Sequence, residues 1–186
     1  MESELETTLE AQVAALRSRL DALEETAPHD RLSMIVFSGD LDKALAACIL
    51  ATGAAAMGME VMMFFTFWGT PLLRKPKGKA PAKDLLGSMF GAMLPKGAAR
   101  AKLSKMHFGG LGTAMMQRLM KRKNVASLEQ LLEIAAGMEV KICICELSMS
   151  LMGFAREEMI DYPNLQYCGV ATFLESAKAS KIQLFL

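Results

Sequence analysis

Apolar residues in the first third of the chain form unbroken runs rather than alternating with polar residues. Residues 32–38 predict one strand in this way, and residues 60–67 predict a second. A run without alternation is typical of a central parallel strand that is covered on both faces. Between these strands an Ala-rich segment predicts a helix over 41–57, with Asp40 as its N-cap and Gly58 at its end.

The alternation of strands and helices continues in the last third of the chain. Further strands are predicted over 140–145, 165–168 and 182–186. Further helices are predicted over 127–136, 146–159 and 170–179, the second with a break near Gly153. The first of these begins with Ser127 and Gln130 in the spacing of a capping box. We therefore predict a three-layer, Rossmann-like α/β fold, with about five parallel strands and helices on both faces.

Residues 1–28 form a separate N-terminal segment that precedes the α/β domain, which we assign to residues 29–186. Apolar residues in the segment recur with alternating spacings of four and three, at Leu9, Val13, Leu16, Leu20 and Leu23. This heptad pattern predicts an amphipathic helix of the coiled-coil type, too short to be stable alone. The helix either pairs with another copy of the chain or lies on its own domain.

Residues 70–123 interrupt the domain with an insertion rich in Lys, Pro and Gly, in which short helices are predicted near 83–93 and 111–121. The insertion holds thirteen Lys or Arg and one acidic residue, although the net charge of the chain is only +1. Such a segment suits an anionic lipid surface, an acidic partner, or an acidic surface of the same chain or a sister subunit. Nucleic acid is not expected, because the insertion has no Trp or Tyr to stack on bases.

High hydrophobicity raises the question of a membrane protein. Hydrophobic residues make up 52% of the chain, and residues 44–68, with one charge, are long enough to span a bilayer. Gly53, Gly58 and Glu60 interrupt that stretch, and a Glu inside an isolated membrane helix is costly. A helix followed by a strand is therefore favoured, in a soluble cytoplasmic protein. Peripheral contact with a membrane through the basic insertion is left as an open alternative.

Four cysteines provide the candidate chemistry: Cys48, Cys143, Cys145 and Cys168. The acidic N-terminus is unlike a signal peptide, so reduced thiols are expected rather than a disulfide framework. Two His and no CxxC pair argue against a structural zinc site. We expect no metal and no organic cofactor.

Cys145 is the predicted nucleophile, because it ends a strand and directly precedes a predicted helix. Ligands of parallel α/β sheets bind outside the carboxyl ends of the strands. Backbone N–H groups at a helix N-terminus stabilise a thiolate, although Glu146 would oppose this if its carboxylate pointed at the sulfur. The alternative is an inert buried thiol, which is what we expect for Cys48 and Cys143. Cys168, at the end of the following strand, is a candidate second thiol.

Several short motifs occur in order along residues 32–186. They are Phe37-Ser38-Gly39-Asp40-Leu41-Asp42-Lys43-Ala44, Phe67-Trp68-Gly69, Leu103-Ser104-Lys105-Met106 with Gly109-Gly110-Leu111-Gly112, and Cys145-Glu146-Leu147-Ser148-Met149 with Met152-Gly153-Phe154. In this order they resemble the DsrE/DsrF/DsrH-like family. The resemblance is to the branch with a long insertion after the second strand, often labelled sulfur carrier or peroxiredoxin-like.

The resemblance implies a homo-oligomer whose cysteine takes sulfane sulfur as a persulfide from a donor and passes it to an acceptor protein. The family's cysteine position falls on Cys145, shortly before Ser148 and Met149. Two further motifs are expected to flank Cys145 across the crevice. The first is Ser38, Gly39 and Asp40, after the first strand, and the second contains Trp68 and Gly69, after the second strand. For Trp68, packing in the core or in an interface is favoured over contact with a substrate.

Two functions of different classes follow from these observations. The first is a sulfur carrier or sulfurtransferase that works through Cys145. The second is a non-enzymatic, oligomeric interaction protein that docks through its basic insertion on a membrane surface or an acidic partner. A peroxidase is disfavoured, because no cysteine has the Pro-Thr surroundings usual for a peroxidatic cysteine.

Overall fold

The computed structural model describes residues 2–26, 28–76, 89, 91 and 93–186. The helix predicted near 83–93 falls largely outside these residues. Within the described part of the chain, no helix combines the length and apolar character needed to cross a membrane. Residues 44–68 form most of a helix and then a strand, as predicted.

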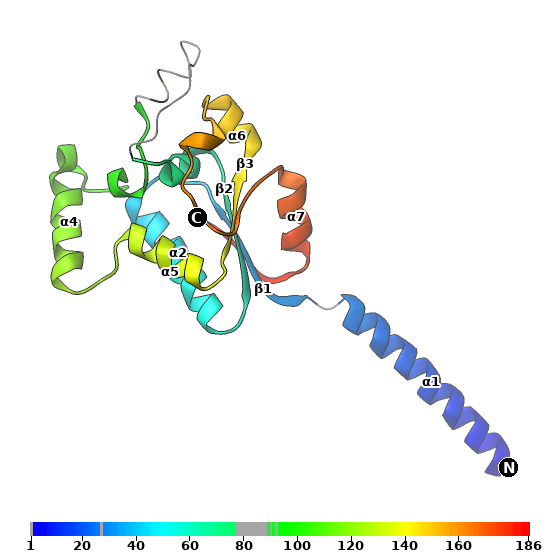
Figure 1. Cartoon of the computed structure of the whole chain (residues 1–186). Helices are drawn as coiled ribbons and strands as arrows, with labels where there is room; N and C mark the ends of the chain where they lie inside the picture. The colour runs from blue at the N-terminus through cyan, green and yellow to red at the C-terminus, as the bar shows by residue number, and fades with distance from the viewer. Residues whose placement is uncertain (1, 27, 77–88, 90, 92) are drawn as a thin grey trace.

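A five-stranded, all-parallel sheet forms the centre of the domain (Figure 1). Its strands are β1 (His29–Val36), β2 (Glu60–Phe65), β3 (Lys141–Cys145), β4 (Leu165–Cys168) and β5 (Ser180–Phe185). Their order is β4-β3-β2-β1-β5, so the three strands after the insertion flank the first two on both sides. The predicted α/β fold with about five parallel strands is confirmed.

Helices cover both faces of the sheet (Figure 1). Helices α2 (Leu41–Ala56) and α5 (Leu128–Gly137) lie together on one face, and α7 (Val170–Lys178) lies on the other. The capping box of α5 is present as predicted, since Gln130 N–H donates to the Ser127 hydroxyl and Ser127 N–H to the Gln130 side chain. Helix α1 (Glu2–Thr26) extends away from the domain.

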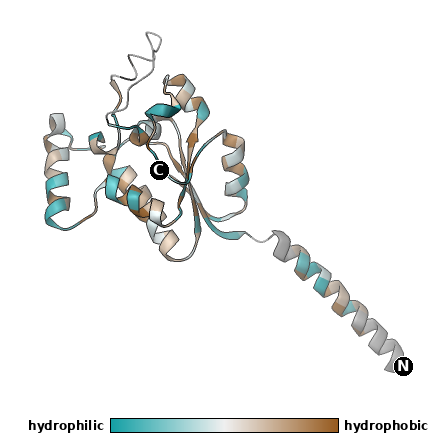
Figure 2. Ribbon diagram, viewed as in Figure 1, coloured by the Kyte–Doolittle hydropathy of each residue, from teal (hydrophilic) through white to brown (hydrophobic). Residues whose placement is uncertain are grey.

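Alternate residues of each strand point to two separate apolar clusters. The larger cluster lies between the sheet and α2 and α5, and it includes Met63 and Phe65 of β2. The smaller lies under α7 and consists of Met62, Phe64, Cys143, Cys145, Cys168, Phe173 and Ala177. In Figure 2 hydrophobic colour is concentrated in the strands and the helices around them, whereas α4 (Leu111–Arg122) carries hydrophilic colour along much of its length.

Two predicted elements are shorter than expected because the backbone turns early. Strand β2 stops at Phe65, and residues Phe67–Leu73 form a 3-10 helix that starts with a left-handed φ of 42° at Phe67. Helix α6 (Glu146–Leu151) ends before Gly153, whose φ is 64°, and only a 3-10 turn over Arg156–Glu158 follows. Both early endings lie at the carboxyl edge of the sheet.

The insertion is attached to the rest of the domain at two points among its described residues. At the first, the buried guanidinium of Arg74 pairs with Glu158 at 2.9 Å, donates to the Gly91 carbonyl and lies over the Phe154 ring. At the second, Asp42 at the start of α2 accepts hydrogen bonds from the backbone N–H and the hydroxyl of Ser104. These contacts hold the basic segment against the end of the sheet.

A candidate thiolate site at the carboxyl edge of the sheet

Cys145 is the last residue of β3 and the N-cap of α6. Its side chain is buried, with 6% of the residue exposed, in the small cluster under α7. It is a free thiol. The change from strand to helix occurs without an intervening loop, so Cys145 directly precedes the first turn of the helix, although its side chain makes no capping hydrogen bond.

Four polar groups near Cys145 lower the pKa of its thiol. They are the hydroxyl and backbone N–H of Ser148, the hydroxyl of Thr66 and the backbone N–H of Leu147. Burial alone would raise the pKa of the Cys145 thiol, but these groups favour the thiolate, and the net effect is a pKa below its ordinary value. The site therefore favours the nucleophilic form of the cysteine.

Ser148 connects the end of β2 to the cysteine. Its fully buried hydroxyl lies 2.9 Å from the hydroxyl of Thr66 and accepts the N–H of Phe67, also at 2.9 Å. Thr66 and Leu147 were not among the predicted site residues. Thr66 could have been predicted as a site residue from its position just after the second strand, because the carboxyl ends of parallel strands lie at the same edge of a sheet.

Glu146 does not point its charge at the sulfur. Its carboxylate pairs with the Arg156 guanidinium at 2.6 Å, and that guanidinium lies over the ring of Tyr167. The condition under which Glu146 would oppose a thiolate is therefore absent. Met149, in the same turn of α6, packs into the larger cluster on the opposite side of the sheet from Cys145.

The expectation of reduced thiols is wrong for two cysteines. Cys143 and Cys168 form a disulfide, with their Cα atoms 6.2 Å apart. The reason is strand pairing: β4 lies beside β3, so Cys168 is paired in register with Cys145 and points to the face that Cys143 and Cys145 share. Cys143 is buried as predicted, but it is not an isolated thiol.

Cys48 is the other free cysteine, and it lies in the larger cluster on α2. Burial raises the pKa of its thiol to about 12. A thiol with this pKa is almost entirely protonated at neutral pH, so the two free cysteines differ sharply in expected reactivity.

The motif residues after β1 and β2 line a separate cavity. Ser38, Gly39, Asp40 and Trp68 line a cavity of about 370 Å³, and Cys145 is not among its lining residues. Asp40 is the N-cap of α2 by position, but its carboxylate accepts from the Ser38 hydroxyl and pairs with Lys43 instead of capping the helix.

Two glycines hold the motif segments close together. A Cβ on Gly69 would collide with the Val36 carbonyl, and one on Gly39 would collide with the Trp68 carbonyl. Trp68 itself is 47% exposed, so it does not pack in the core.

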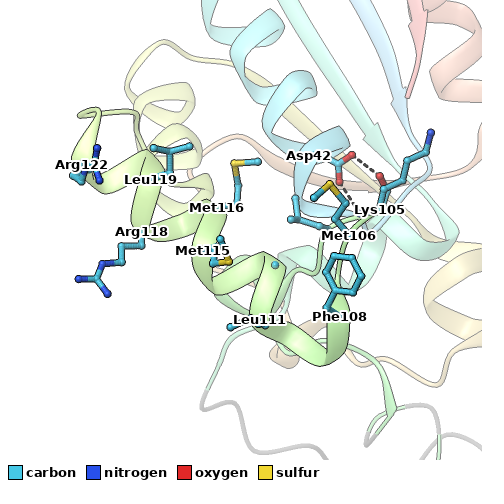
Figure 3. Close-up of a pocket in the computed structure, with 13 residues that line it drawn as sticks. Asp42, Lys105, Met106, Phe108, Leu111, Met115, Met116, Arg118, Leu119 and Arg122 are labelled. Atoms are coloured by element: carbon cyan, nitrogen blue, oxygen red, sulfur yellow. Dashed lines mark hydrogen bonds between the residues drawn. The ribbon is translucent and has the colours of Figure 1, made fainter.

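The described part of the insertion forms an apolar groove of about 750 Å³ beside α4 (Figure 3). Met106 and Phe108 lie on one side of it, facing Met115 and Met116 of α4 on the other. Basic side chains border the groove, namely Lys105, Arg118 and Arg122. Among the described residues, no group of three or more His, Cys, Asp or Glu is arranged to hold a metal ion.

Comparison with known proteins identifies the family to which this parallel α/β domain belongs. The model of the DsrE/DsrF/DrsH-like family matches residues 28–185, and the chain belongs to this family. Helix α1 precedes the matched region.

Two relatives align over nearly their whole length. One is the protein named uncharacterized protein YrkE of Bacillus subtilis, 44% identical over 84% of this chain and 96% of its own. The other is the sulfur carrier protein DsrE2 of Allochromatium vinosum, 38% identical over 84% of this chain and 98% of its own.

Proposed function

We propose that this protein is a sulfur carrier that holds sulfane sulfur as a persulfide on Cys145 and passes it to a partner protein. The observation that carries the proposal is the place of the free thiol of Cys145, at the end of β3 and directly before α6. The polar groups of Ser148, Thr66 and Leu147 that lower its pKa agree with this role. Membership of the family and the similarity to a protein named sulfur carrier support it.

The chemistry is an exchange of sulfur between thiols. The Cys145 thiolate attacks the outer sulfur of a donor R–S–SH, a new S–S bond forms, and R–S⁻ leaves as the donor's bond breaks. The products are Cys145–S–SH and R–S⁻, so no electrons are gained or lost. An acceptor thiolate then attacks the outer sulfur and releases Cys145. The polar groups that lower the pKa of Cys145 also favour the anion that forms on it at each step.

The donor and acceptor in this proposal are thiol proteins, and we place the relay in the cytoplasm, where partner thiols are kept reduced. The exchange itself uses only thiols and S–S bonds, so it is written here without a metal or an organic cofactor.

The test is intact-protein mass spectrometry after incubation with polysulfide, thiosulfate or tetrathionate. We expect an adduct on Cys145 that dithiothreitol removes and that is absent from Cys145→Ser. Cys48→Ser is the matched control and should load as the natural chain does. Absence of any adduct in folded protein with a free Cys145 would refute the proposal.

A second candidate function is assembly, and the groove beside α4 favours it. The groove is concave, apolar and bordered by Lys105, Arg118 and Arg122, which suits an acidic helix with an apolar stripe better than a flat lipid surface. Helix α1 has that character: it has seven acidic residues and two arginines. Its exposed apolar residues include Leu9, Val13, Leu16 and Leu20. We propose that α1 of a second copy occupies the groove.

Sedimentation velocity of the full chain tests this assembly. Met115→Glu in the groove and Leu16→Glu on α1 should each shift the protein to a smaller species. Met57→Glu, at an exposed residue outside both surfaces, should not. An unchanged sedimentation coefficient in both variants would exclude the arrangement, and binding of the natural chain to anionic vesicles that Met115→Glu abolishes would assign the groove to a membrane instead.

A further inference from the structure

Three of the four cysteines lie on one face of the sheet, in adjacent strands. Cys143 and Cys145 are two residues apart in β3, and Cys168 of β4 is paired in register with Cys145. All three belong to the small cluster under α7. A disulfide between Cys143 and Cys168 thus lies directly beside the free thiol of Cys145.

We propose that the Cys143–Cys168 disulfide is the oxidant with which the protein converts inorganic sulfide into the sulfane sulfur carried by Cys145. This inference rests on the proposed function, since it names a sulfur source for the same cysteine. It adds an activity to sulfur exchange: sulfide oxidation by an internal disulfide.

The first step is attack of HS⁻ on the sulfur of Cys168. A new S–S bond forms, the Cys143–Cys168 bond breaks, and Cys143 leaves as a thiolate that takes up a proton. The product is Cys168–S–SH. Sulfide has lost two electrons, and the disulfide has gained them. Both cysteines are buried, but Cys168 is the less buried end of the pair, since it is 7% exposed and Cys143 is 1% exposed.

The second step moves the outer sulfur to Cys145. The Cys145 thiolate attacks the outer sulfur of Cys168–S–SH, giving Cys145–S–SH and the Cys168 thiolate, which is then protonated. The in-register pairing of the two residues brings their side chains side by side, and the outer sulfur extends the reach of Cys168 further. In sum, H₂S, the disulfide and one thiol become one persulfide and two thiols.

The surroundings of the three cysteines fit this use. Met62, Phe64 and Phe173 pack around the three cysteines in one apolar cluster. Small, neutral H₂S enters such apolar surroundings more readily than a charged reductant, and the proton that it loses on forming HS⁻ balances the one taken up by Cys143. Disulfides of cytosolic proteins are usually transient and catalytic rather than structural. The next turnover requires reoxidation of Cys143 and Cys168 by the disulfide of a second protein, through the same exchange.

Anaerobic loading of the full chain with sodium sulfide tests the proposal. Oxidised protein is desalted and then incubated with sulfide. A parallel sample is incubated with polysulfide, a sulfur donor that needs no oxidant. The sulfur adduct on Cys145 is then measured by peptide mass spectrometry. We expect sulfide to load one sulfur on Cys145 while thiols appear at Cys143 and Cys168. Cys143→Ser, Cys168→Ser and pre-reduced natural protein should lose at least tenfold of the loading from sulfide and keep the loading from polysulfide.

Three results would overturn the proposal. Undiminished loading from sulfide in Cys143→Ser, or in pre-reduced natural protein, would show that the disulfide is not the oxidant. Oxidised protein that loads from polysulfide but not from sulfide would show that sulfide is not a source. Failure to load Cys145 from polysulfide as well would refute the proposed sulfur carrier itself, so the two failures are distinguishable.

Discussion

The hydroxyl oxygen of Thr66, after β2, lies 2.9 Å from the hydroxyl oxygen of Ser148, in the first turn of α6. Both hydroxyls favour the Cys145 thiolate, and Ser148 also accepts the N–H of Phe67. Two elements far apart in the sequence therefore meet through one buried polar contact beside the candidate nucleophile.

Removing the Ser148 hydroxyl should make Cys145 less reactive. In Ser148→Ala the thiolate loses a donor, so the pKa of Cys145 rises, and the thiolate fraction at neutral pH falls about tenfold for each pKa unit. The rate of alkylation by iodoacetamide, followed against pH, measures this. Ser150→Ala, on the exposed side of α6, is the control. A pH profile that stays in place would argue against the role of the hydroxyl.

The two free thiols should react in a fixed order. Because the pKa of Cys145 is lowered and that of Cys48 is raised to about 12, Cys145 should be alkylated in the folded protein and Cys48 only after unfolding. As pH increases from acidic values, the rate at Cys145 should rise and level off below the ordinary pKa of a thiol. Peptide mapping after timed alkylation checks the order, and early labelling of Cys48 would contradict it.

Breaking the buried pair of Arg74 and Glu158 should destabilise the domain. Both side chains are almost fully buried, and Arg74→Ala removes the guanidinium from the buried Glu158 carboxylate, which still accepts the N–H of Ala155. The loss of this partner charge should cost about 3–5 kcal/mol. Urea unfolding measures the loss. Lys75→Ala, which breaks a more exposed pair with Asp161, should cost about 1 kcal/mol or less.

A double variant separates the pair's charge from its packing. Arg74→Met with Glu158→Leu removes both charges and leaves apolar side chains of similar volume. It should be more stable than Arg74→Ala. A double variant as unstable as the single one would mean that lost packing, and not the loss of the partner charge beside Glu158, dominates the cost.

The close approach at Gly69 should not tolerate a side chain. In Gly69→Ala the new Cβ would overlap with the Val36 carbonyl, so the backbone must move, at a cost of about 1–3 kcal/mol. Gly53→Ala is the matched control: Gly53 lies on α2 with nothing near its added Cβ, and Ala should stabilise the helix by about 1 kcal/mol. Thermal unfolding of both variants tests this prediction: the midpoint should fall for Gly69→Ala and rise for Gly53→Ala. Equal shifts in the two variants would contradict it.

Local patterns were sufficient to predict much of the fold. Apolar runs marked the central strands, Ser127 and Gln130 marked the start of α5, and Cys145 was recognised at the junction of a strand and a helix. These features depend on residues close together in the chain, and their hydrogen-bonding and burial preferences are local. The heptad spacing before residue 28 likewise predicted the helix α1.

The sequence by itself therefore determined the order of strands and helices, and the placement of Cys145 at the end of one of them. Only the tertiary structure decided which distant residues meet: Cys143 with Cys168, Thr66 with Ser148, and Arg74 with Glu158. The physical reason is that strand order and register bring these pairs together, and both are set by packing of the whole sheet rather than by any local preference.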